Sequence, residues 1–525
     1  MRKVLCVLLA VCMVLCTMAS CRQEQAPKTL ADVKFDGFAV GFGKADITPN
    51  PDWKIGLWGE NDHYSRLSTG VLEPIGVSCV AFTDTDGFTV ILFGADLHNS
   101  DDKLVASIKE GVQQATGVPA QRVQFNVSHN HAGPDMMSTA FAAVQKSNER
   151  IRTRCIQAAV DAMNTRKVAT METTICRPES MVFHTHYLGI DGTYVVDNYN
   201  DYTKAIIGST ERPDNLMQLV RFRREGEKDI VMVNWQGHPR GTGTKKYDEG
   251  HYYMLNGDYS AVMRRVLLEE ADTESIFIYG ASGNLATFCQ NHVKNITRAY
   301  DDYGRSLAQY VIQALDTMTP ADTGKIYYEA KDYVLPFEGE TKGRKLCAFG
   351  FGDFGYVAEP FETFQSDAVA VREASGYKIT FYASVSNANR HTGYAPDDFA
   401  TTYPNYHRRV SFAPWGTGSA IRDELIRMIT AQFEASGQTP KEKQEGYYAD
   451  HTPETDPQVY KNPKPGDMDQ AIAAKNGHFN LYLALDSGAE KLFLVKNEEV
   501  VKDILSRDTM RLLIYEGMVV GVAEE

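Results

Sequence analysis

The chain has 525 residues, of which 43% are hydrophobic, 23% charged and 10% aromatic. These values are ordinary for a globular protein with a sizeable core, and they exclude a disordered chain or a small stapled domain. The 54 basic and 68 acidic residues give a formal net charge of -14. Because a field of this sign repels phosphate backbones, nucleic acid is not expected as a partner.

Residues 1–20 are expected to be a secretory signal peptide. Arg2 and Lys3 precede an apolar stretch of about a dozen residues, which is short for a membrane span. The ending Met-Ala-Ser-Cys resembles a bacterial lipobox, so Cys21 is predicted to be the acylated first residue of an exported cell-envelope lipoprotein. The alternative is an ordinary cleaved signal followed by a chance cysteine. Residues 21–36 are polar, as expected of a tether between a membrane anchor and a folded domain.

From Phe38 onward, short apolar runs alternate with stretches of helical periodicity. Strands are expected over 75–82, 88–95, 122–128, 229–235 and 275–280, and helices over 102–116, 148–163, 258–270 and 300–316. This order predicts a mixed α/β (α+β) fold, with central buried sheets flanked by helices. We expect one large catalytic domain over 37–435, a linker over 436–468, and a small C-terminal αβ subdomain over 469–525.

Cysteine usage after the leader points away from both disulfides and thiolate metal sites. The five cysteines that follow Cys21 are odd in number, and no two of them have CxxC spacing. They are Cys79, Cys155, Cys176, Cys289 and Cys347. Most are expected to be small buried hydrophobic residues.

Two expected strands end at histidines. His129 and His131 follow the first strand in VQFNVSHNHAGPD, and residues two apart in an extended chain share one face. His238 follows the second strand in DIVMVNWQGHPRGTG. Three imidazoles at strand ends indicate a zinc site, because zinc prefers neutral imidazole and oxygen ligands. The alternatives are a chance HxH in a surface loop and a core histidine satisfied by the backbone.

A family resemblance follows from these motifs and their order. The segments VGFGKADITPN, TGVLEPIGVSCVAF, HNHAGPD and NWQGHP occur in the order seen in neutral, non-lysosomal ceramidases. The chain resembles a divergent bacterial member of that family over roughly residues 37–435. The resemblance implies a zinc-dependent amidohydrolase that cleaves the N-acyl bond of ceramide.

The resemblance also implies a ligand set for one zinc ion per chain. The family's histidine ligands match His129, His131 and His238. Its glutamate ligand matches Glu362 in AEPFETF, with Glu359 as the competitor. Its ligand tyrosine matches Tyr394, and a second active-site tyrosine twelve residues later matches Tyr406, for which an oxyanion-stabilising role is expected.

The chain departs from the family pattern at three places. In GASGNLATF, Ala286 stands where the family has serine, with Ser282 and Thr287 nearby. In FHTHYLGIDG, Thr185 and His186 stand where the family has arginine. The immunoglobulin-like C-terminal domain of well-known members is not recognisable. Because zinc can itself activate water, the missing serine does not exclude hydrolysis.

Several further residues are candidates for the same site. Asn284, Ala286 and His186 are expected to line the substrate pocket. Asp96, which ends another expected strand in FGADLHNS, is a candidate catalytic or ligand-orienting carboxylate. The alternative is a helix N-terminal acid. The remaining histidines are treated mainly as structural or pocket residues; they are His98, His184, His251 and His391.

Three hypotheses about the function follow. The first is a zinc amidohydrolase, anchored to a membrane by lipid, that acts on ceramide or a related N-acyl lipid. The second keeps the metal and changes the bond, giving an esterase or a deacetylase of glycans or peptides. The third is a degenerate lipoprotein that binds ligands without catalysis.

Overall fold

The computed structural model describes residues 29–57, 66–99, 101–189, 194–196, 206–240, 250–290, 295–387, 392–403 and 405–450, and the backbone of five strands between 480 and 519. The expected signal peptide and Cys21 lie outside these residues. Among the described residues, no helix combines the length and apolar character needed to cross a membrane.

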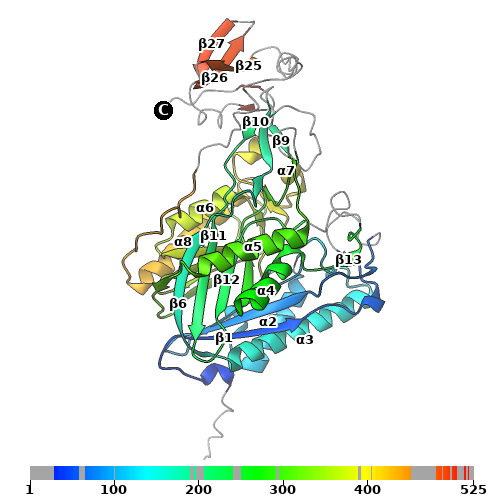
Figure 1. Ribbon diagram of the computed structural model, residues 1–525, viewed down its shortest axis with the longest axis vertical. Coiled ribbons are helices and arrows are strands. Elements are labelled where there is room, and N and C mark those ends of the chain that lie inside the picture. Colours follow the sequence, from blue (N-terminus) through cyan, green and yellow to red (C-terminus); the bar gives the residue numbers. More distant parts are fainter. Residues whose placement is uncertain are drawn as a thin grey trace, which may run out of the picture.

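The helices of the described residues are α2 (Asp102–Thr116), α3 (Ala142–Asn164), α4 (Asp258–Ala271), α5 (Tyr300–Leu315), α6 (Gln365–Ala374), α7 (Tyr406–Val410) and α8 (Thr417–Ser436). Helices α2–α5 and helices α6 and α8 form two separate groups, and α7 lies apart from both, near β9 (Tyr194–Val196) and β10 (Ile206–Ser209) (Figure 1). Short 3-10 turns occur at Leu30–Asp32, Pro51–Trp53, Ala120–Arg122 and Ala400–Thr402.

The main sheet has nine strands, in the order β14-β12-β11-β6-β1-β3-β4-β5, with β18 also paired to β6. The bounds are β1 (Ala39–Asp46), β3 (Gly76–Thr83), β4 (Thr89–Ala95), β5 (Val123–Val127), β6 (Lys167–Cys176), β11 (Met217–Arg224), β12 (Ile230–Trp235), β14 (Glu274–Tyr279) and β18 (Thr319–Ala321). β4 and β5 pair in parallel, as do β12 and β14.

A second sheet of four strands packs on the main sheet. Its order is β19 (Tyr327–Val334), β20 (Gly343–Phe351), β21 (Phe354–Ala358) and β23 (Ile379–Ala383).

The remaining strands are short or belong to the C-terminal region. They are β2 (Gly70–Val71), β7 (Phe183–His184), β8 (His186–Gly189), β9 (Tyr194–Val196), β10 (Ile206–Ser209), β13 (Met254–Leu255), β15 (Leu285–Ala286), β16 (Cys289–Gln290), β17 (Asn295–Ile296), β22 (Glu362–Thr363), β24 (Tyr394–Ala395), β25 (Asn480–Asp486), β26 (Ala489–Lys496), β27 (Glu499–Ile504), β28 (Ile514–Tyr515) and β29 (Met518–Val519).

Strand periodicity explains how the sheets and helices stack in four layers. Along β4, Ile91 and Phe93 pack toward α2–α5, whereas Val90 and Leu92 pack toward the second sheet. The far face of the second sheet packs against α6 and α8. Each large apolar side chain buried between these layers contributes about 1.5–3 kcal/mol of transfer free energy.

Glycines allow α3 to lie close on β1. A Cβ atom at Gly41 would lie 1.8 Å from the Ala162 carbonyl oxygen, and one at Gly43 would lie 2.1 Å from the Ala158 carbonyl oxygen. Because no side chain fits at these distances, the two glycines set the spacing between the helix layer and the main sheet.

The main sheet curls so that its two edge strands meet. The backbone of β14 approaches β4 closely, since a Cβ atom at Gly94 would lie 2.6 Å from the Phe277 carbonyl oxygen. The segment after β23 joins both edges: the amide of Ser384 donates to Tyr279 O at 3.0 Å, and the amide of Asn387 donates to Phe125 O at 2.7 Å. The carboxyl ends of β5, β12 and β14 are therefore brought together.

The expected secondary structure is largely found. Each of the five expected strands and four expected helices has a counterpart, and the largest difference is that α3 begins at Ala142 rather than at residue 148. The five cysteines are free, and all except the half-buried Cys176 are buried. Residues 437–450 of the expected linker lie against the domain, where Tyr447 is fully buried. The αβ composition of 469–525 stays a prediction.

Candidate metal centre

Three histidines that follow β5 and β12 meet in one buried cluster. The ring centroids of His129 and His238 are 5.0 Å apart, as are those of His131 and His238. The Nε2 atoms of His131 and His238 are 2.9 Å apart. None of the three rings is more than 8% exposed. The structure therefore brings together the three histidines predicted from the strand ends.

Two short parallel strands add a carboxylate and a phenol to this cluster. β22 and β24 pair so that Glu362 lies opposite Tyr394. The Glu362 Oε2 atom is 3.1 Å from His129 Nε2. The phenol of Tyr394 contacts the same carboxylate; burial, then the negative charge of Glu362, raises the pKa of Tyr394 well above its usual value. All five expected ligand residues thus lie in one place.

The donor atoms fit a divalent cation. One donor atom each from His129, His238 and Glu362 lies within 4.8 Å of the others. His129 Nδ1 lies 2.8 Å from the backbone oxygen of His98, and a carbonyl only accepts, so this nitrogen carries the proton. A ring nitrogen of His238 is likewise bonded to the Ser282 backbone. Such backbone bonds are how proteins orient imidazole ligands toward a metal.

The atoms that face one another in this cluster are acceptors. Because Nδ1 of His129 donates to the His98 carbonyl, its Nε2 atom is the one that faces Glu362 Oε2. That oxygen is buried and accepts no hydrogen bond from the described residues. Two facing acceptors repel unless a proton or a cation lies between them, which is the environment that a zinc ion would satisfy.

His129 is held in a strained backbone conformation. Its φ angle is 61°, in the left-handed region that non-glycine residues rarely adopt. Its amide donates to Leu97 O at 2.9 Å, which fixes this conformation. Such strain costs about 1–3 kcal/mol and concentrates at functional sites.

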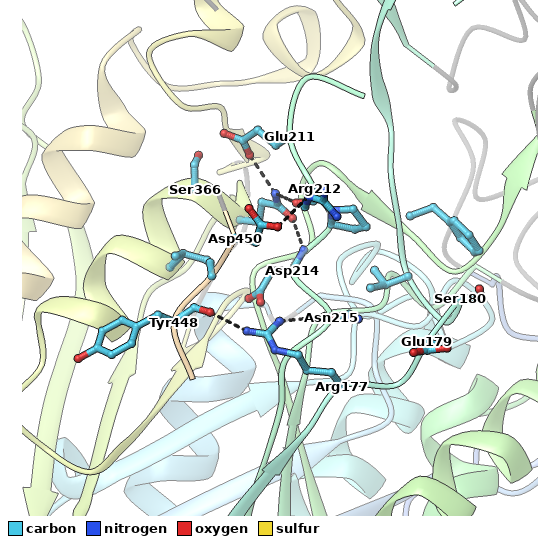
Figure 2. Close-up of a pocket in the computed structure, with 16 residues that line it drawn as sticks. Arg177, Glu179, Ser180, Glu211, Arg212, Asp214, Asn215, Ser366, Tyr448 and Asp450 are labelled. Atoms are coloured by element: carbon cyan, nitrogen blue, oxygen red, sulfur yellow. Dashed lines mark hydrogen bonds and ion pairs between the residues drawn. The ribbon is translucent and has the colours of Figure 1, made fainter. Parts of the chain in front are cut away.

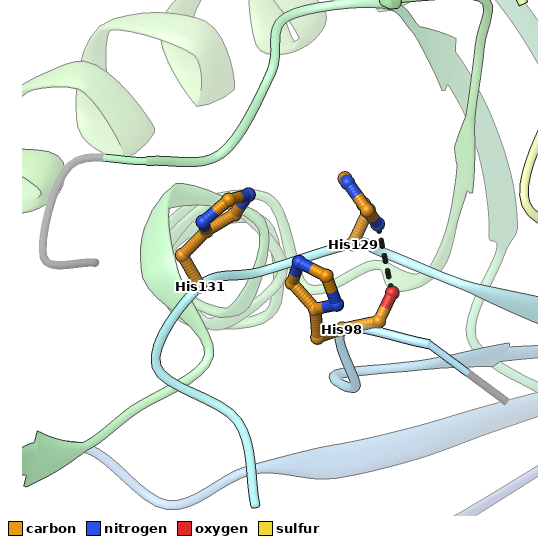
Figure 3. A group of neighbouring side chains, drawn as sticks. All are labelled: His98, His129 and His131. Atoms are coloured by element: carbon orange, nitrogen blue, oxygen red, sulfur yellow. Dashed lines mark hydrogen bonds between the residues drawn. The ribbon is translucent and has the colours of Figure 1, made fainter. Parts of the chain in front are cut away.

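His98 is a fourth histidine of this cluster (Figure 3). Its ring centroid lies 4.2 Å from that of His129 and 4.6 Å from that of His131. The three residues present donor atoms within 4.8 Å of one another. Burial, followed by the charges of His98 and His238, lowers the pKa of His131 well below its usual value. His131 is therefore neutral at pH 7.

The geometry separates Glu362 from its competitor Glu359. Glu359 is fully buried, and its carboxylate accepts a 2.6 Å hydrogen bond from the Phe361 amide. Burial raises the pKa of Glu359 to about 8, so this group is protonated at neutral pH. Only Glu362 belongs to the group of donor atoms around His129 and His238.

Asp96 is occupied by structural partners. Its two oxygens accept from Arg264 at 2.9 Å and 2.5 Å, and the Gly76 amide donates to it at 2.8 Å. The side chain is fully buried. This geometry gives no support to the prediction that Asp96 acts in catalysis, and it explains the residue as the buried partner of Arg264.

A second group of aromatic and imidazole side chains lies beside Tyr394. The ring of His407 lies 4.6 Å from that of Tyr394 and 5.4 Å from that of Tyr406. His407 Nδ1 is 2.8 Å from His186 Nε2, and His186 Nδ1 is 2.5 Å from the Tyr403 hydroxyl. His186, which stands where the ceramidase family has arginine, is thus connected to the expected ligand Tyr394 through His407.

The GNLATF turn (residues 283–288) contributes hydrogen bonds and a short strand pair near the site. Asn284 Nδ2 lies 3.0 Å from His184 Nε2, and Asn284 Oδ1 accepts from the Gln365 amide at 2.9 Å. Ala286 pairs with Phe183 in the β7–β15 ladder. The nearby Ser282 hydroxyl is bonded to the Tyr279 hydroxyl. The substrate-binding roles of Asn284, Ala286 and His186 stay predictions.

A pocket with charged walls lies next to this turn, because Phe183 and Gln365, which pair with Ala286 and Asn284, belong to its lining (Figure 2). It has a volume of about 590 Å³, and its walls carry charges of both signs. Arg212 pairs with Asp450 at 2.9 Å. Glu211 lies 3.7 Å from His184, whose ring centroid is 5.8 Å from that of His186, so the pocket wall lies near the second imidazole group.

Acid is expected to destabilise the metal-free protein through these buried histidines. Burial, then the charges of Arg240 and His184, lowers the pKa of His407 from 6.5 to about 3. Between these values the unfolded chain binds a proton that the folded chain rejects, so the free energy of unfolding falls as the pH falls. His407 alone contributes up to about 1.4 kcal/mol per pH unit. Urea unfolding in chelator at pH 7 and pH 5 should show a smaller decrease for His407→Gln; an equal decrease contradicts this assignment.

Three residues of the site were not predicted to belong to the metal cluster or its surroundings: His98 was expected to be mainly a structural or pocket residue, and His407 and Arg240 were given no role. His98 follows a strand that runs parallel to β5, and this adjacency was the available signal. His407 directly follows Tyr406. Arg240 lies two residues after His238, and its charge contributes, after burial, to the lowered pKa values of His131, His238 and His407.

The fold and the site together define a mixed α/β protein with a buried histidine and carboxylate cluster suited to one divalent cation. The fold is that of the neutral ceramidases. The crystal structure of neutral ceramidase from Pseudomonas aeruginosa matches with a TM-score of 0.59 at 12% identity, covering 79% of this chain and 76% of that chain. A ceramidase complexed with C2 matches with a TM-score of 0.58 at 12% identity, covering 78% and 77%.

These matches confirm the expected fold class and the expected resemblance at the level of the fold. No protein-family model matches the chain, and no curated protein matches it.

Proposed function

We propose that the protein is a zinc-dependent amidohydrolase that cleaves the N-acyl bond of ceramide or of a related N-acyl lipid. The observation that carries the proposal is the convergence of His129, His238 and Glu362 donor atoms within 4.8 Å, on a ceramidase-like fold. His131 and Tyr394 complete the set of residues that would hold the ion.

The chemistry divides between the metal and the side chains. When bound, zinc polarises a carbonyl group and activates water at neutral pH. Burial keeps His131 and His238 neutral, the form in which imidazole binds a divalent cation. The Tyr406 phenol beside Tyr394 would donate a hydrogen bond to the oxyanion that develops on the attacked carbonyl. Such a donor is worth about 3–4 kcal/mol when it is pre-aimed.

The pocket with charged walls favours a second candidate, an esterase or deacetylase that acts on a glycan or a peptide. Its charges of both signs and the position of Glu211 beside His184 suit a polar ligand better than an acyl chain. The chain has His186 in the place where neutral ceramidases have arginine, and this difference also changes how a polar group of the substrate would be held.

Hydrolysis assays on the purified protein test these candidates. We expect zinc-dependent release of fatty acid from a fluorogenic N-acyl sphingosine, faster than from simple acyl esters or acetylated sugars. Faster turnover of the esters or sugars would favour the second candidate. Zinc-loaded protein that cleaves none of them would contradict both and leave the non-catalytic binding lipoprotein.

We also propose that the protein is exported and anchored to the cell envelope by a lipid on Cys21. The leader sequence supports this proposal. Mass spectrometry of the mature N-terminus should find diacylglycerol on Cys21, and an unmodified N-terminus after a simple cleavage would contradict it.

A further inference from the structure

Two aromatic side chains project into solvent between α7 and α8. Phe412 is 69% exposed and Trp415 is 59% exposed, which, with Tyr448, are the largest exposed fractions of any large apolar side chain in the described residues. Single exposed apolar residues are common, but two largely exposed aromatic rings within four residues form a local apolar patch on the surface. We refer to residues 411–416 as the aromatic loop.

The aromatic loop is held rigidly in this outward conformation. The Ser411 hydroxyl donates to Tyr394 O at 2.7 Å, and the Thr417 hydroxyl donates to Pro414 O at 2.6 Å. The Arg408 guanidinium lies 3.8 Å from the centroid of the Trp415 ring and supports it. The exposure of the rings is therefore built into the loop, and little conformational entropy is lost when they bind.

The aromatic loop packs beside β24, the strand that carries the expected ligand Tyr394. Gly393 precedes the expected ligand Tyr394 and has a φ angle of 63°. A Cβ atom at this glycine would lie 2.6 Å from Val410 O and 3.1 Å from the Phe412 ring. Whatever binds the aromatic loop is thus placed next to β24 and its tyrosine.

Two arginines accompany the aromatic rings in a chain whose net charge is negative. Arg408 and the exposed Arg409 end α7, immediately before the aromatic loop. A protein with a net charge of -14 is repelled by an anionic surface, so a basic patch determines which face can approach it. Aromatic rings flanked by arginines are the side chains that proteins place at the boundary between lipid headgroups and acyl chains.

We propose that the aromatic loop is a membrane-docking site, in which Phe412 and Trp415 insert into the interface of an anionic bilayer while Arg408 and Arg409 contact lipid phosphates. Docking of this loop places the metal centre at the lipid surface. The proposal concerns binding alone, so it holds or fails independently of hydrolytic activity.

Vesicle binding tests the proposal without any turnover. Unacylated protein (Cys21→Ser, leader removed) is mixed with vesicles of phosphatidylcholine containing 30% phosphatidylglycerol and no N-acyl lipid, and bound protein is measured by sedimentation. Phe412→Ser with Trp415→Ser should lower the partition coefficient about tenfold or more. Arg408→Gln with Arg409→Gln should lower it, and should also reduce its dependence on salt.

Controls separate docking from folding and from self-association. Phe141→Ser removes another exposed aromatic ring, at 47% exposure, and should leave binding unchanged. All variants should keep the melting temperature of the parent protein. Wild-type binding that the Phe412 and Trp415 changes leave intact would overturn the proposal, as would no binding at low salt. A dimer in sedimentation velocity that these changes dissociate would also overturn it, because the loop would then bind a second copy of the chain.

Discussion

Glu362→Gln is expected to lose zinc, whereas Glu359→Gln is expected to retain it. Glu362 faces His129 Nε2 across 3.1 Å, and an amide cannot supply the negative charge that this position offers to a cation. The loss of affinity should exceed the roughly 10–100-fold that removal of an outer hydrogen-bond partner costs. Hydrolysis should fall with metal occupancy.

Glu359→Gln is a matched control, since the two carboxylates are three residues apart. Its carboxyl group is protonated at neutral pH, and glutamine is nearly isosteric with a protonated glutamate. Competition with a chromophoric zinc chelator measures both affinities in parallel. Zinc retained by Glu362→Gln and lost from Glu359→Gln would reverse the assignment.

Asp96→Ala is expected to destabilise the fold without altering zinc affinity. The change leaves Arg264 partly buried with no carboxylate, and breaking such a pair costs about 3–5 kcal/mol. Urea unfolding of the zinc-free protein measures the change in the free energy of unfolding.

A double-mutant cycle with Arg264→Ala provides the control. The double variant should be less destabilised than the sum of the two single changes, because each single change leaves a partner behind. Unchanged stability, together with loss of kcat, would instead support the catalytic role that the strand-end position of Asp96 predicts.

Local sequence pattern was enough to predict most of the buried strands and helices. The apolar run at 88–95 appears as Thr89–Ala95, and the helical spacing at 102–116 appears as α2 with the same bounds. The start of α3 was missed because Ala142–Ser147 carries little apolar periodicity; Val144 and Ser147 are buried there by tertiary packing.

The candidate site could be predicted in part, because histidines follow two of the expected strands and because Tyr394 and Tyr406 are twelve residues apart. The choice between Glu359 and Glu362 depends on the pairing of β22 with β24, which no local pattern encodes. The role of His98 depends on β4 lying parallel to β5. The partner of Asp96 is 168 residues away, and only the folded chain brings Arg264 to it.

The convergence of the two sheet edges is the feature least accessible from sequence. It depends on the segment 384–387, in which Val385 and Asn387 adopt φ angles of 52° and 65°. This segment binds the ends of β5 and β14, and so places His129 and His131 beside the histidine that follows β12.

Anomalous scattering at the zinc absorption edge tests the central claim most directly. In crystals of zinc-loaded protein, we predict one strong peak per chain, at about 2.0–2.2 Å from His129 Nε2, a ring nitrogen of His238 and an oxygen of Glu362. A cluster with no peak, or a peak bound by other residues, would contradict the account.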